Sequence, residues 1–345
     1  MNVLSLFDGM ACGRIALERC GYNVTNYFAS EIDKYAMKVA KANYPDIQHL
    51  GDVCDVIWPE TFEGIKIDLL IGGSPCQGFS FAGSQLNFDD PRSKLFWEYV
   101  RLLKEAKPRY FLLENVRMKQ QSQDVISEAL GVKPIAINSN LVSAQNRHRL
   151  YWTNIPFIFM PADKGIVLKD ILEDGLVDRD KSHCLDANYW KGGNLKQYFE
   201  KHRRQLVFSS NGICHVGDAD IPGFAARRRV YHPDGKSPTL LSATGGAHQP
   251  KILQIGHGFN AGGLKASDGK TPSTTTSSWQ HNNHLTFDEG LTWRKLTCVE
   301  CERLQTVPDN YTAHVSNTQR YKMLGNGWTV DVVAHILKNM EIDDV

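Results

Sequence analysis

The sequence lacks an apolar run near the ~18 residues that a membrane-spanning helix needs. Its opening stretch, MNVLSLFDGM, also lacks the basic and then apolar pattern of a secretory signal. Both absences argue against a membrane or exported protein, and we expect a cytoplasmic one. The 345 residues are enough for a sizeable core and for two domains, which is a common size for an enzyme.

The sequence also lacks the cysteine spacing of a disulfide scaffold. Its eight cysteines are scattered along a long chain, which favours reduced thiols, one of which is a candidate nucleophile. Cys298 and Cys301 have a C-x-x-C spacing, but no second pair completes a structural zinc site. We therefore expect no metal cofactor and assign this spacing to a helix.

Net charge is nearly absent, at +1, but the charges are unevenly distributed. Residues 179–295 hold 16 lysines and arginines against 9 acidic residues, together with eight of the twelve histidines. The histidines would add positive charge at lower pH. A basic segment of this kind suits a polyanionic partner, although a solvated surface is the commoner origin of such an excess.

Short apolar runs alternate with helical patterns over the first 155 residues. The apolar runs are NVLSLF, NYFASEI, KIDLLIGG, RYFLLENV, KPIAIN and RLYWTNI. Helical patterns lie between them at 12–20, 33–43, 92–106 and 122–130. Strands that alternate with helices predict parallel βαβ units, and hence an α/β fold with a doubly wound sheet.

From about residue 179 the pattern changes to short segments rich in Gly, Ser, Thr, Asn and His. Two similar stretches, DGKSPTLLSATGG at 234–246 and DGKTPSTTTSSWQ at 268–280, indicate paired turns. Helical patterns return after residue 290. We therefore expect a first domain over 1–178, an inserted loop-rich domain over 179–290, and a C-terminal segment over 291–345 that returns to the first domain.

Ligands of open parallel sheets bind beyond the carboxyl ends of the strands. The loop FDGMACG follows the first apolar run, and its glycines allow close approach of the backbone to a ligand. Glu31 follows in the second run and suits the two hydroxyls of a ribose, whereas Asp52 is placed to accept a hydrogen bond from an exocyclic amine. Together the three predict a nucleoside pocket without the lysine of a P-loop. Taken alone, FDGMACG also fits a tight turn with no ligand.

The stretch GGSPCQGFS places Cys76 directly after KIDLLIGG, on a bend of Gly, Ser and Pro. If cations or hydrogen-bond donors lie nearby, Cys76 would be a thiolate and a nucleophile. The alternative is a small core residue, as most cysteines after an apolar strand are. The bend argues against burial and so against this alternative. Glu114 fits a general acid beside that cysteine, or a helix N-cap. Arg147 and Arg149 would share one face of an extended strand and suit a phosphate or a base edge, with surface ion pairs as the alternative.

In this order, the motifs resemble the DNA (cytosine-5-)-methyltransferase family of bacteria and phages. The resemblance runs essentially end to end, through FDGMACG, SEID, GDV, GSPCQGFS, ENV, QNRHR, RKLTCVECERLQTVPDNY and GNGW. It implies a class I, Rossmann-like fold that uses S-adenosyl-L-methionine (AdoMet), with residues 179–290 as an inserted target-recognition domain. Ala11, Cys12 and Ser74 depart from the usual bacterial pattern and are similar to the animal de novo methyltransferases.

The resemblance also implies site residues. Cys76 would add to carbon 6 of a cytosine flipped out of duplex DNA, and Glu114 would engage the ring. Arg147 and Arg149 would hold the flipped nucleotide. The residues implied to bind AdoMet are Phe7, Gly9, Met10, Glu31, Ile32, Asp52, Val53, Pro75 and Asn326. Those implied to contact DNA are Gln77, Ser80, Arg92, Arg227, Arg228, Arg229 and Thr239.

Duplex DNA is thus the expected partner, a cognate restriction endonuclease is a candidate partner, and we expect a monomer. One alternative is a tRNA cytosine methyltransferase with the same core, but the large basic insertion argues against it. Another is a DNA-binding relative without catalysis, but the complete set of Cys76, Glu114 and the two arginines argues against that. Either Thr239 or the second, similar stretch would read the bases, and the sequence leaves that choice open.

Overall fold

The computed structural model describes residues 1–75, 91–193, 195–208, 215–218, 229–231, 251–252 and 293–341. The chain divides into two compact units. Unit 1 comprises Met1–Ile171, Lys181–Gly192 and Thr297–Val345, and unit 2 comprises Leu172–Asp180 and Gly193–Leu296. Among the described helices, none has both the length and the hydropathy that crossing a membrane requires.

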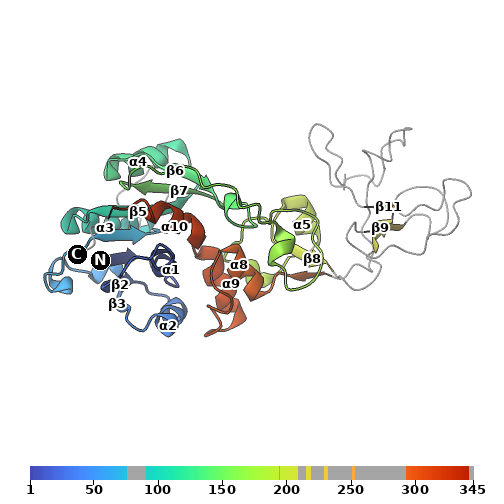
Figure 1. Cartoon of the computed structure of the whole chain (residues 1–345), viewed down its shortest axis with the longest axis horizontal. Coiled ribbons are helices and arrows are strands. Elements are labelled where there is room, and N and C mark those ends of the chain that lie inside the picture. The colour runs from blue at the N-terminus through green and yellow to red at the C-terminus, as the bar shows by residue number, and fades with distance from the viewer. Residues whose placement is uncertain are drawn as a thin grey trace, which may run out of the picture. The chain divides into compact units, whose positions relative to one another are not determined.

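A seven-stranded sheet forms the centre of unit 1 (Figure 1), in the order β3-β2-β1-β4-β5-β7-β6. Its strands are β1 (Asn2–Leu6), β2 (Asn26–Ser30), β3 (Gln48–Gly51), β4 (Leu69–Gly72), β5 (Tyr110–Val116), β6 (Ile135–Asn138) and β7 (His148–Thr153). The first five strands pair in parallel, and β7 runs antiparallel to both of its neighbours. The predicted α/β fold with a doubly wound sheet is confirmed, and the sheet is mostly parallel.

Two features of this sheet differ from the sequence prediction. β7 follows β6 after only residues 139–147, which are too few for a helical crossover, so the strand returns antiparallel. β3 lies outside the predicted apolar runs. Its sequence, QHLG, is partly exposed at the edge of the sheet and lacks the alternation that marks a half-buried strand.

Helices cover both faces of the sheet. The first four are α1 (Cys12–Arg19), α2 (Lys34–Asn43), α3 (Pro91–Ala106) and α4 (Gln120–Leu130). Leu4 of β1 packs into one core with Phe96 and Tyr99 of α3. On the other face α1 approaches so closely that a Cβ on Gly13 would lie 2.3 Å from Cδ1 of Ile71. The strands are therefore buried on both sides, as is usual for parallel sheets.

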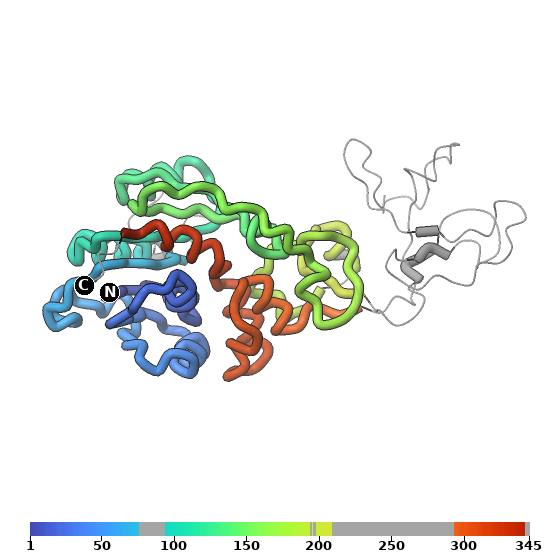
Figure 2. The backbone as a smooth tube through the Cα atoms, in the orientation of Figure 1, coloured from blue at the N-terminus to red at the C-terminus, as the bar shows by residue number. Residues whose placement is uncertain are grey.

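The C-terminal part of unit 1 consists of α8 (Cys298–Leu304), α9 (Asn317–Asn326) and α10 (Val330–Leu337). Thr297 starts α8 with a capping box to Glu300. The fully buried Glu302 pairs with Arg320 at 3.0 Å, which ties α8 to α9. α10 packs beside α1, and the Tyr22 hydroxyl donates a hydrogen bond to the carbonyl of Leu337 at the end of α10. Figure 2 shows this red end of the chain returning to the blue beginning.

Unit 2 contains α5 (Leu195–Lys201) and two small sheets. β8 (Leu206–Phe208) pairs with β12 (Trp293–Lys295), and the other sheet consists of β9 (His215–Asp218), β10 (Arg229–Tyr231) and β11 (Lys251–Ile252). Tyr198, Leu206 and Phe208 form a small apolar cluster in this unit.

The boundary between the units differs in detail from the predicted boundary at residue 179. Residues 181–192 belong to unit 1, although the sequence pattern groups them with the inserted domain. The Ser182 N–H donates to the Ala144 carbonyl at 2.7 Å, and the Ser182 carbonyl accepts from the Asn146 N–H at 2.9 Å. These bonds hold the segment against the chain that leads into β7.

Candidate active site

The loop between β1 and α1 has a strained backbone. Phe7, Gly9 and Ala11 all have positive φ angles, of 56°, 62° and 66°. A left-handed conformation is unfavourable for residues other than glycine, so surrounding contacts must hold this loop. The Gly9 N–H donates to Oε2 of Glu31 at 2.8 Å, which supplies one such contact.

Glu31 follows β2 next to this loop because β1 and β2 pair in register, Leu6 with Ser30. Its Oε1 accepts hydrogen bonds from the N–H groups of Ile32 and Asp33, both at 2.7 Å. A carboxylate oxygen has about two acceptor positions, so the oxygen bonded to Gly9 keeps one for a ligand. This geometry suits a ligand hydroxyl such as that of a ribose.

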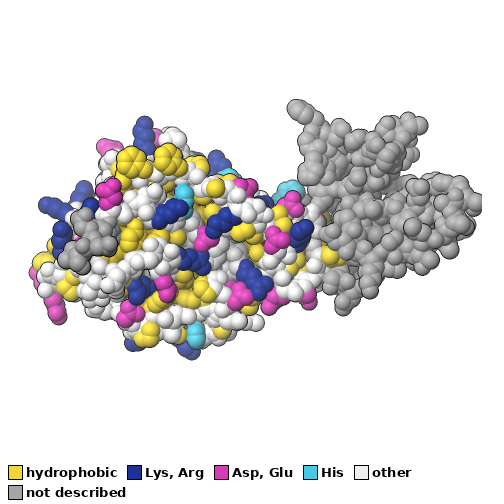
Figure 3. Space-filling model, in the orientation of Figure 1, with side chains coloured by type: hydrophobic (Ala, Val, Ile, Leu, Met, Phe, Trp, Pro, Cys, Tyr) yellow, Lys and Arg dark blue, Asp and Glu magenta, His cyan; other side chains and the backbone are white. Residues whose placement is uncertain are grey.

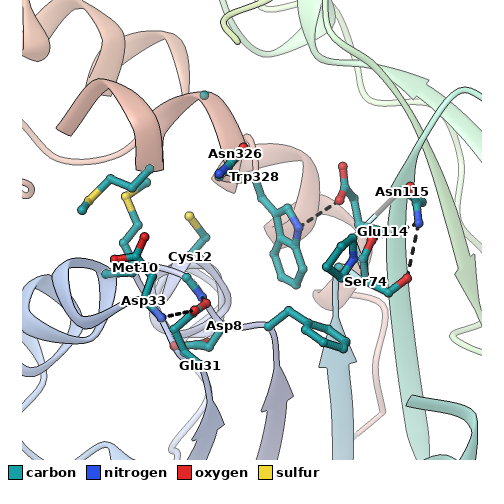
Figure 4. Close-up of a pocket in the computed structure, with 18 of the residues that line it drawn as sticks. Asp8, Met10, Cys12, Glu31, Asp33, Ser74, Glu114, Asn115, Asn326 and Trp328 are labelled. Atoms are coloured by element: carbon teal, nitrogen blue, oxygen red, sulfur yellow. Dashed lines mark hydrogen bonds between the residues drawn. The ribbon is translucent and has the colours of Figure 1, made fainter. Parts of the chain in front are cut away.

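The loop and Glu31 line a cavity of about 410 Å³, within the range of roughly 300–1,000 Å³ that small-molecule sites occupy. Its wall comes from the loop after β1, the end of β2, the residues after β4, the end of β5, Arg147, Arg149 and the end of α9. Figure 4 shows carboxylates, sulfur atoms and an indole arranged around it. The cavity therefore lies at the carboxyl ends of the parallel strands, where open α/β sheets bind their ligands.

Most residues predicted to bind AdoMet line this cavity, namely Phe7, Gly9, Met10, Glu31, Pro75 and Asn326. The other three predicted residues lie outside its lining. Ile32 is 74% exposed and Val53 is buried in the core. Asp52 caps a short 3-10 helix by accepting from the Cys54 N–H. Local structure thus accounts for Asp52 and Val53, and their contact with adenine stays a prediction.

Glu114 lies within β5 and is 8% exposed. Its Oε1 pairs with Nε of Arg149 at 2.9 Å, and its Oε2 accepts from the Trp328 indole at 3.1 Å (Figure 4). Burial is the largest single effect and opposes the charge on Arg149, but Glu114 and the smaller favourable contributions together outweigh it, so the pKa of Arg149 lies above its usual value. The N-cap of the next helix, α4, is Lys119, so the N-cap alternative for Glu114 is wrong.

Asn115 holds the loop that leads to Cys76. Its side-chain amide donates to the Ser74 carbonyl at 3.2 Å and to the Ser74 hydroxyl at 3.4 Å. The predicted residues that lie outside the described ones are Cys76, Gln77, Ser80, Arg227, Arg228 and Thr239. Arg92 in α3 and Arg229 in β10 are described by their backbone alone.

Arg147 lines the cavity, and its predicted contact with a flipped nucleotide stays a prediction. It is 2% exposed, and its guanidinium donates to three main-chain carbonyls, two of which belong to Gly325 and Gly327. Burial, and next the nearby Arg149, lower its pKa. These bonds engage the guanidinium in holding the loop after α9. Sequence spacing alone does not separate Arg147 from Arg149, whereas burial does.

Two titratable groups of the loop after β1 are buried. Burial raises the pKa of the Cys12 thiol to about 12, so this thiol is neutral near pH 7 and a poor nucleophile. Burial also raises the pKa of Asp8 from 3.8 to about 7, although Ser5 and Tyr27 donate hydrogen bonds to its Oδ1. Oδ2 of Asp8 has no hydrogen-bond partner among the described residues.

Asp8 should make the stability of the protein depend on pH. The folded state keeps a proton on Asp8 up to about pH 7, whereas the unfolded chain releases it near pH 4, so stability falls as the pH rises through this window. From this group alone, the free energy of unfolding should fall by about 2–3 kcal/mol between pH 5 and pH 8. Urea unfolding at both pH values measures the fall. Asp8→Asn should remove this part of it, and equal falls in both proteins would contradict the assignment.

Sequence reasoning missed several residues that line the cavity, among them Asp33, Lys322 and Trp328. Asp33 pairs with Lys322 at 2.8 Å, which joins the start of α2 to α9. Asp33 and Trp328 lie within the motifs SEID and GNGW, so the sequence could have indicated them as site residues. Lys322 lies in no such motif, and the sequence gives no indication of its position. The described part of the chain contains no group of three or more His, Cys, Asp or Glu side chains that could hold a metal ion.

Known proteins resemble this chain along nearly its whole length. The orphan methyltransferase M.SPRI of Bacillus phage SPR is 28% identical over 429 aligned residues, which cover 99% of this chain and 97% of the relative. The type II methyltransferase M.HpaII of Haemophilus parainfluenzae is 28% identical over 351 aligned residues, which cover 96% of this chain and 86% of the relative.

Solved structures share the fold. The methyltransferase EhMeth of Entamoeba histolytica matches with a TM-score of 0.61 at 15% identity, over 98% of this chain and 97% of that one. The Dnmt2 methyltransferase of S. pombe matches with a TM-score of 0.55 at 17% identity and the same coverage. The model of the family described as C-5 cytosine-specific DNA methylase matches residues 1–341. Because this match spans nearly the whole chain, the protein belongs to the C-5 cytosine-specific DNA methylase family.

Proposed function

We propose that this protein transfers a methyl group from AdoMet to carbon 5 of cytosine within a specific sequence of duplex DNA. Members of its family methylate cytosine in DNA. The observation that carries the proposal is the buried Glu114–Arg149 pair, which lies on the wall of the same cavity as Glu31. Glu114, which suits a contact with a nucleobase, and Glu31, which suits a contact with a ribose, thus line one cavity.

The lining of the cavity fits AdoMet. A Cβ on Gly9 would meet nothing within 4 Å, so the loop leaves open space there, and Glu31 keeps an acceptor position for a ribose hydroxyl. We assign Phe7, Gly9, Met10, Glu31 and Asn326 to the cofactor. When bound, AdoMet supplies an electrophilic methyl group on a sulfonium. The proposed chemistry needs no metal, because a thiolate activates the base.

Cys76 is the proposed nucleophile. Carbon 5 of cytosine is itself a poor nucleophile, but addition of the thiolate to carbon 6 turns the ring into an enamine whose carbon 5 accepts a methyl group. Glu114 stabilises the adduct by a hydrogen bond or a proton at ring nitrogen 3, while Arg149 holds the carboxylate. Loss of the carbon-5 proton to a water-assisted base and departure of the Cys76 thiolate then restore the aromatic ring.

Duplex DNA is the proposed partner. Carbon 6 is inaccessible in a stacked helix, so the target cytosine must be flipped out at a cost on the order of a few kcal/mol. We assign target recognition to the basic segment 179–295, with Arg227, Arg228 and Arg229 at phosphates and Thr239 near bases. On the face drawn in Figure 3, by contrast, acidic and basic side chains of the described surface are interspersed. We expect a monomer, and a cognate restriction endonuclease is a candidate partner.

Bisulfite sequencing of DNA from cells that express the protein tests the proposal. Cells that express Cys76→Ala are the matched control. Cytosines protected in one sequence context, and only with the wild-type protein, would support both the reaction and a specific target. Uniform conversion in both samples would contradict the proposal. The same assay on tRNA then tests the tRNA alternative, and AdoMet binding without transfer to either substrate would indicate the non-catalytic relative.

A further inference from the structure

Trp328 lines the cavity and contacts Glu114 directly. Its indole N–H donates to Oε2 of Glu114 at 3.1 Å, and both side chains are buried. Figure 4 shows the indole reaching from the C-terminal segment toward Glu114. Since Oε1 pairs with Arg149, both oxygens of the carboxylate are held. Each oxygen still has about one further acceptor position with which to meet a base.

Gly73 provides the space for this contact. β4 and β5 pair in parallel with Gly72 opposite Leu113, so Gly73 lies beside Glu114. A Cβ on Gly73 would lie 3.0 Å from Nε1 of Trp328 and 3.2 Å from Oε2 of Glu114. Both distances are shorter than ordinary van der Waals contacts, so a side chain at this position would require the indole or the carboxylate to shift.

The loop that carries Trp328 is fixed by buried polar contacts. Arg147 and Gln305 both donate to the Gly327 carbonyl, at 2.8 and 3.2 Å. Gly327 also packs against the loop after β1, since a Cβ there would lie 3.1 Å from Cε of Met10. The same short segment therefore contacts the proposed cofactor site through Gly327 and the proposed catalytic carboxylate through Trp328.

We propose that Trp328 is a positioning residue that, together with Arg149, holds Glu114 in the orientation in which it meets the cytosine ring. This inference rests on the proposed cytosine methylation. Without the indole N–H, the Glu114 carboxylate is held at one oxygen only and can turn about its last torsion. It then meets the base less often in the productive orientation, and the chemical step slows. The residues assigned to AdoMet keep their own hydrogen bonds, because the indole N–H donates to Glu114 and to none of them.

Trp328→Phe tests the proposal, because it removes the N–H and keeps an aromatic ring. The assay is release of tritium to water from DNA labelled at carbon 5 of cytosine, without AdoMet, since thiolate addition alone labilises that hydrogen. Tritium release, and kcat for methylation with AdoMet present, should both fall about 10- to 100-fold, the usual effect of one lost hydrogen bond to a charged group. The Kd of AdoMet should stay close to the wild-type value.

The matched control is Trp152→Phe, since the Trp152 indole donates to the Ser127 hydroxyl at 3.0 Å and does not line the cavity. This variant should release tritium like the wild type. In a Glu114→Gln background, Trp328→Phe should add little further loss, because the two residues act through one contact. Gly73→Ala is a second variant that crowds the contact between the indole and the carboxylate and keeps both side chains, and it should lower tritium release in the same way.

Unchanged tritium release in Trp328→Phe, with or without weaker AdoMet binding, would overturn the proposal and assign the indole to the cofactor site or to packing. Thermal unfolding checks that each variant folds, and Gly73→Ala decides the question if Trp328→Phe does not. A wild-type protein that neither releases tritium nor methylates DNA would instead refute the proposed function itself. The two failures are therefore distinguishable.

Discussion

Replacing Cys76 with alanine should abolish methyl transfer to DNA while AdoMet and DNA still bind. The proposed reaction begins with addition of this thiolate to carbon 6, and alanine cannot form that bond. Loss of a nucleophile lowers turnover on the order of 10⁴-fold or more, so transfer should fall below detection. Incorporation of labelled methyl groups into DNA measures the rate, and titration calorimetry measures the binding of AdoMet.

Another cysteine provides the control for this experiment. Cys54 is exposed on a short helix after β3, and Cys54→Ala should methylate DNA like the wild type. Cys12 is unsuited to take over from Cys76, because burial raises its pKa to about 12 and keeps the thiol protonated. Methyl transfer by Cys76→Ala at the wild-type rate would show that the nucleophile is a different residue.

Glu114→Gln should lower methyl transfer by about 10²- to 10⁴-fold, the usual contribution of a general acid or base. Glutamine keeps the length and shape of the side chain and still accepts a hydrogen bond from Arg149 or Trp328. It cannot exchange a proton with ring nitrogen 3. AdoMet binding should be unchanged, because Glu31 and the loop after β1 are untouched. Single-turnover methylation with enzyme in excess measures the chemical step without product release.

Glu98→Gln is the matched control, since Glu98 pairs with Arg101 on α3 at 2.8 Å and does not line the cavity. It removes one carboxylate from unit 1 and should retain the wild-type rate. Near-normal turnover in Glu114→Gln would remove Glu114 from the mechanism, and its pair with Arg149 would then be structural only.

The sheet and the loop after β1 could be predicted from the sequence because both depend on local patterns. Short apolar runs mark β1, β2, β4 and β5. Gly9 has the positive φ that its place in a tight strand-to-helix turn suggests. The positions of Glu31 and Glu114 at one edge of the sheet could be predicted, because the carboxyl ends of parallel strands meet there.

Contacts that depend on distant packing could not be predicted in this way. Trp328 and Glu114 are 214 positions apart, and no local pattern links them. Arg147 and Arg149 look equivalent in the sequence, yet the fold buries Arg147 among main-chain carbonyls and leaves Arg149 to pair with Glu114. The direction of β7 depends on the length of its connection to β6, and apolar alternation carries no information on direction.

The division of the chain has a consequence for any exchange of the proposed target-recognition domain. Because residues 181–192 return to unit 1, unit 2 consists of two separate pieces, Leu172–Asp180 and Gly193–Leu296. These pieces pair with each other, since Leu176 bridges to Phe208. A chimera that exchanges only the longer piece would keep the native Leu172–Asp180, which would then have to pair with a foreign sequence in place of Phe208. A productive graft should exchange both pieces together and keep 181–192, whose Leu185 carbonyl accepts a hydrogen bond from Arg147.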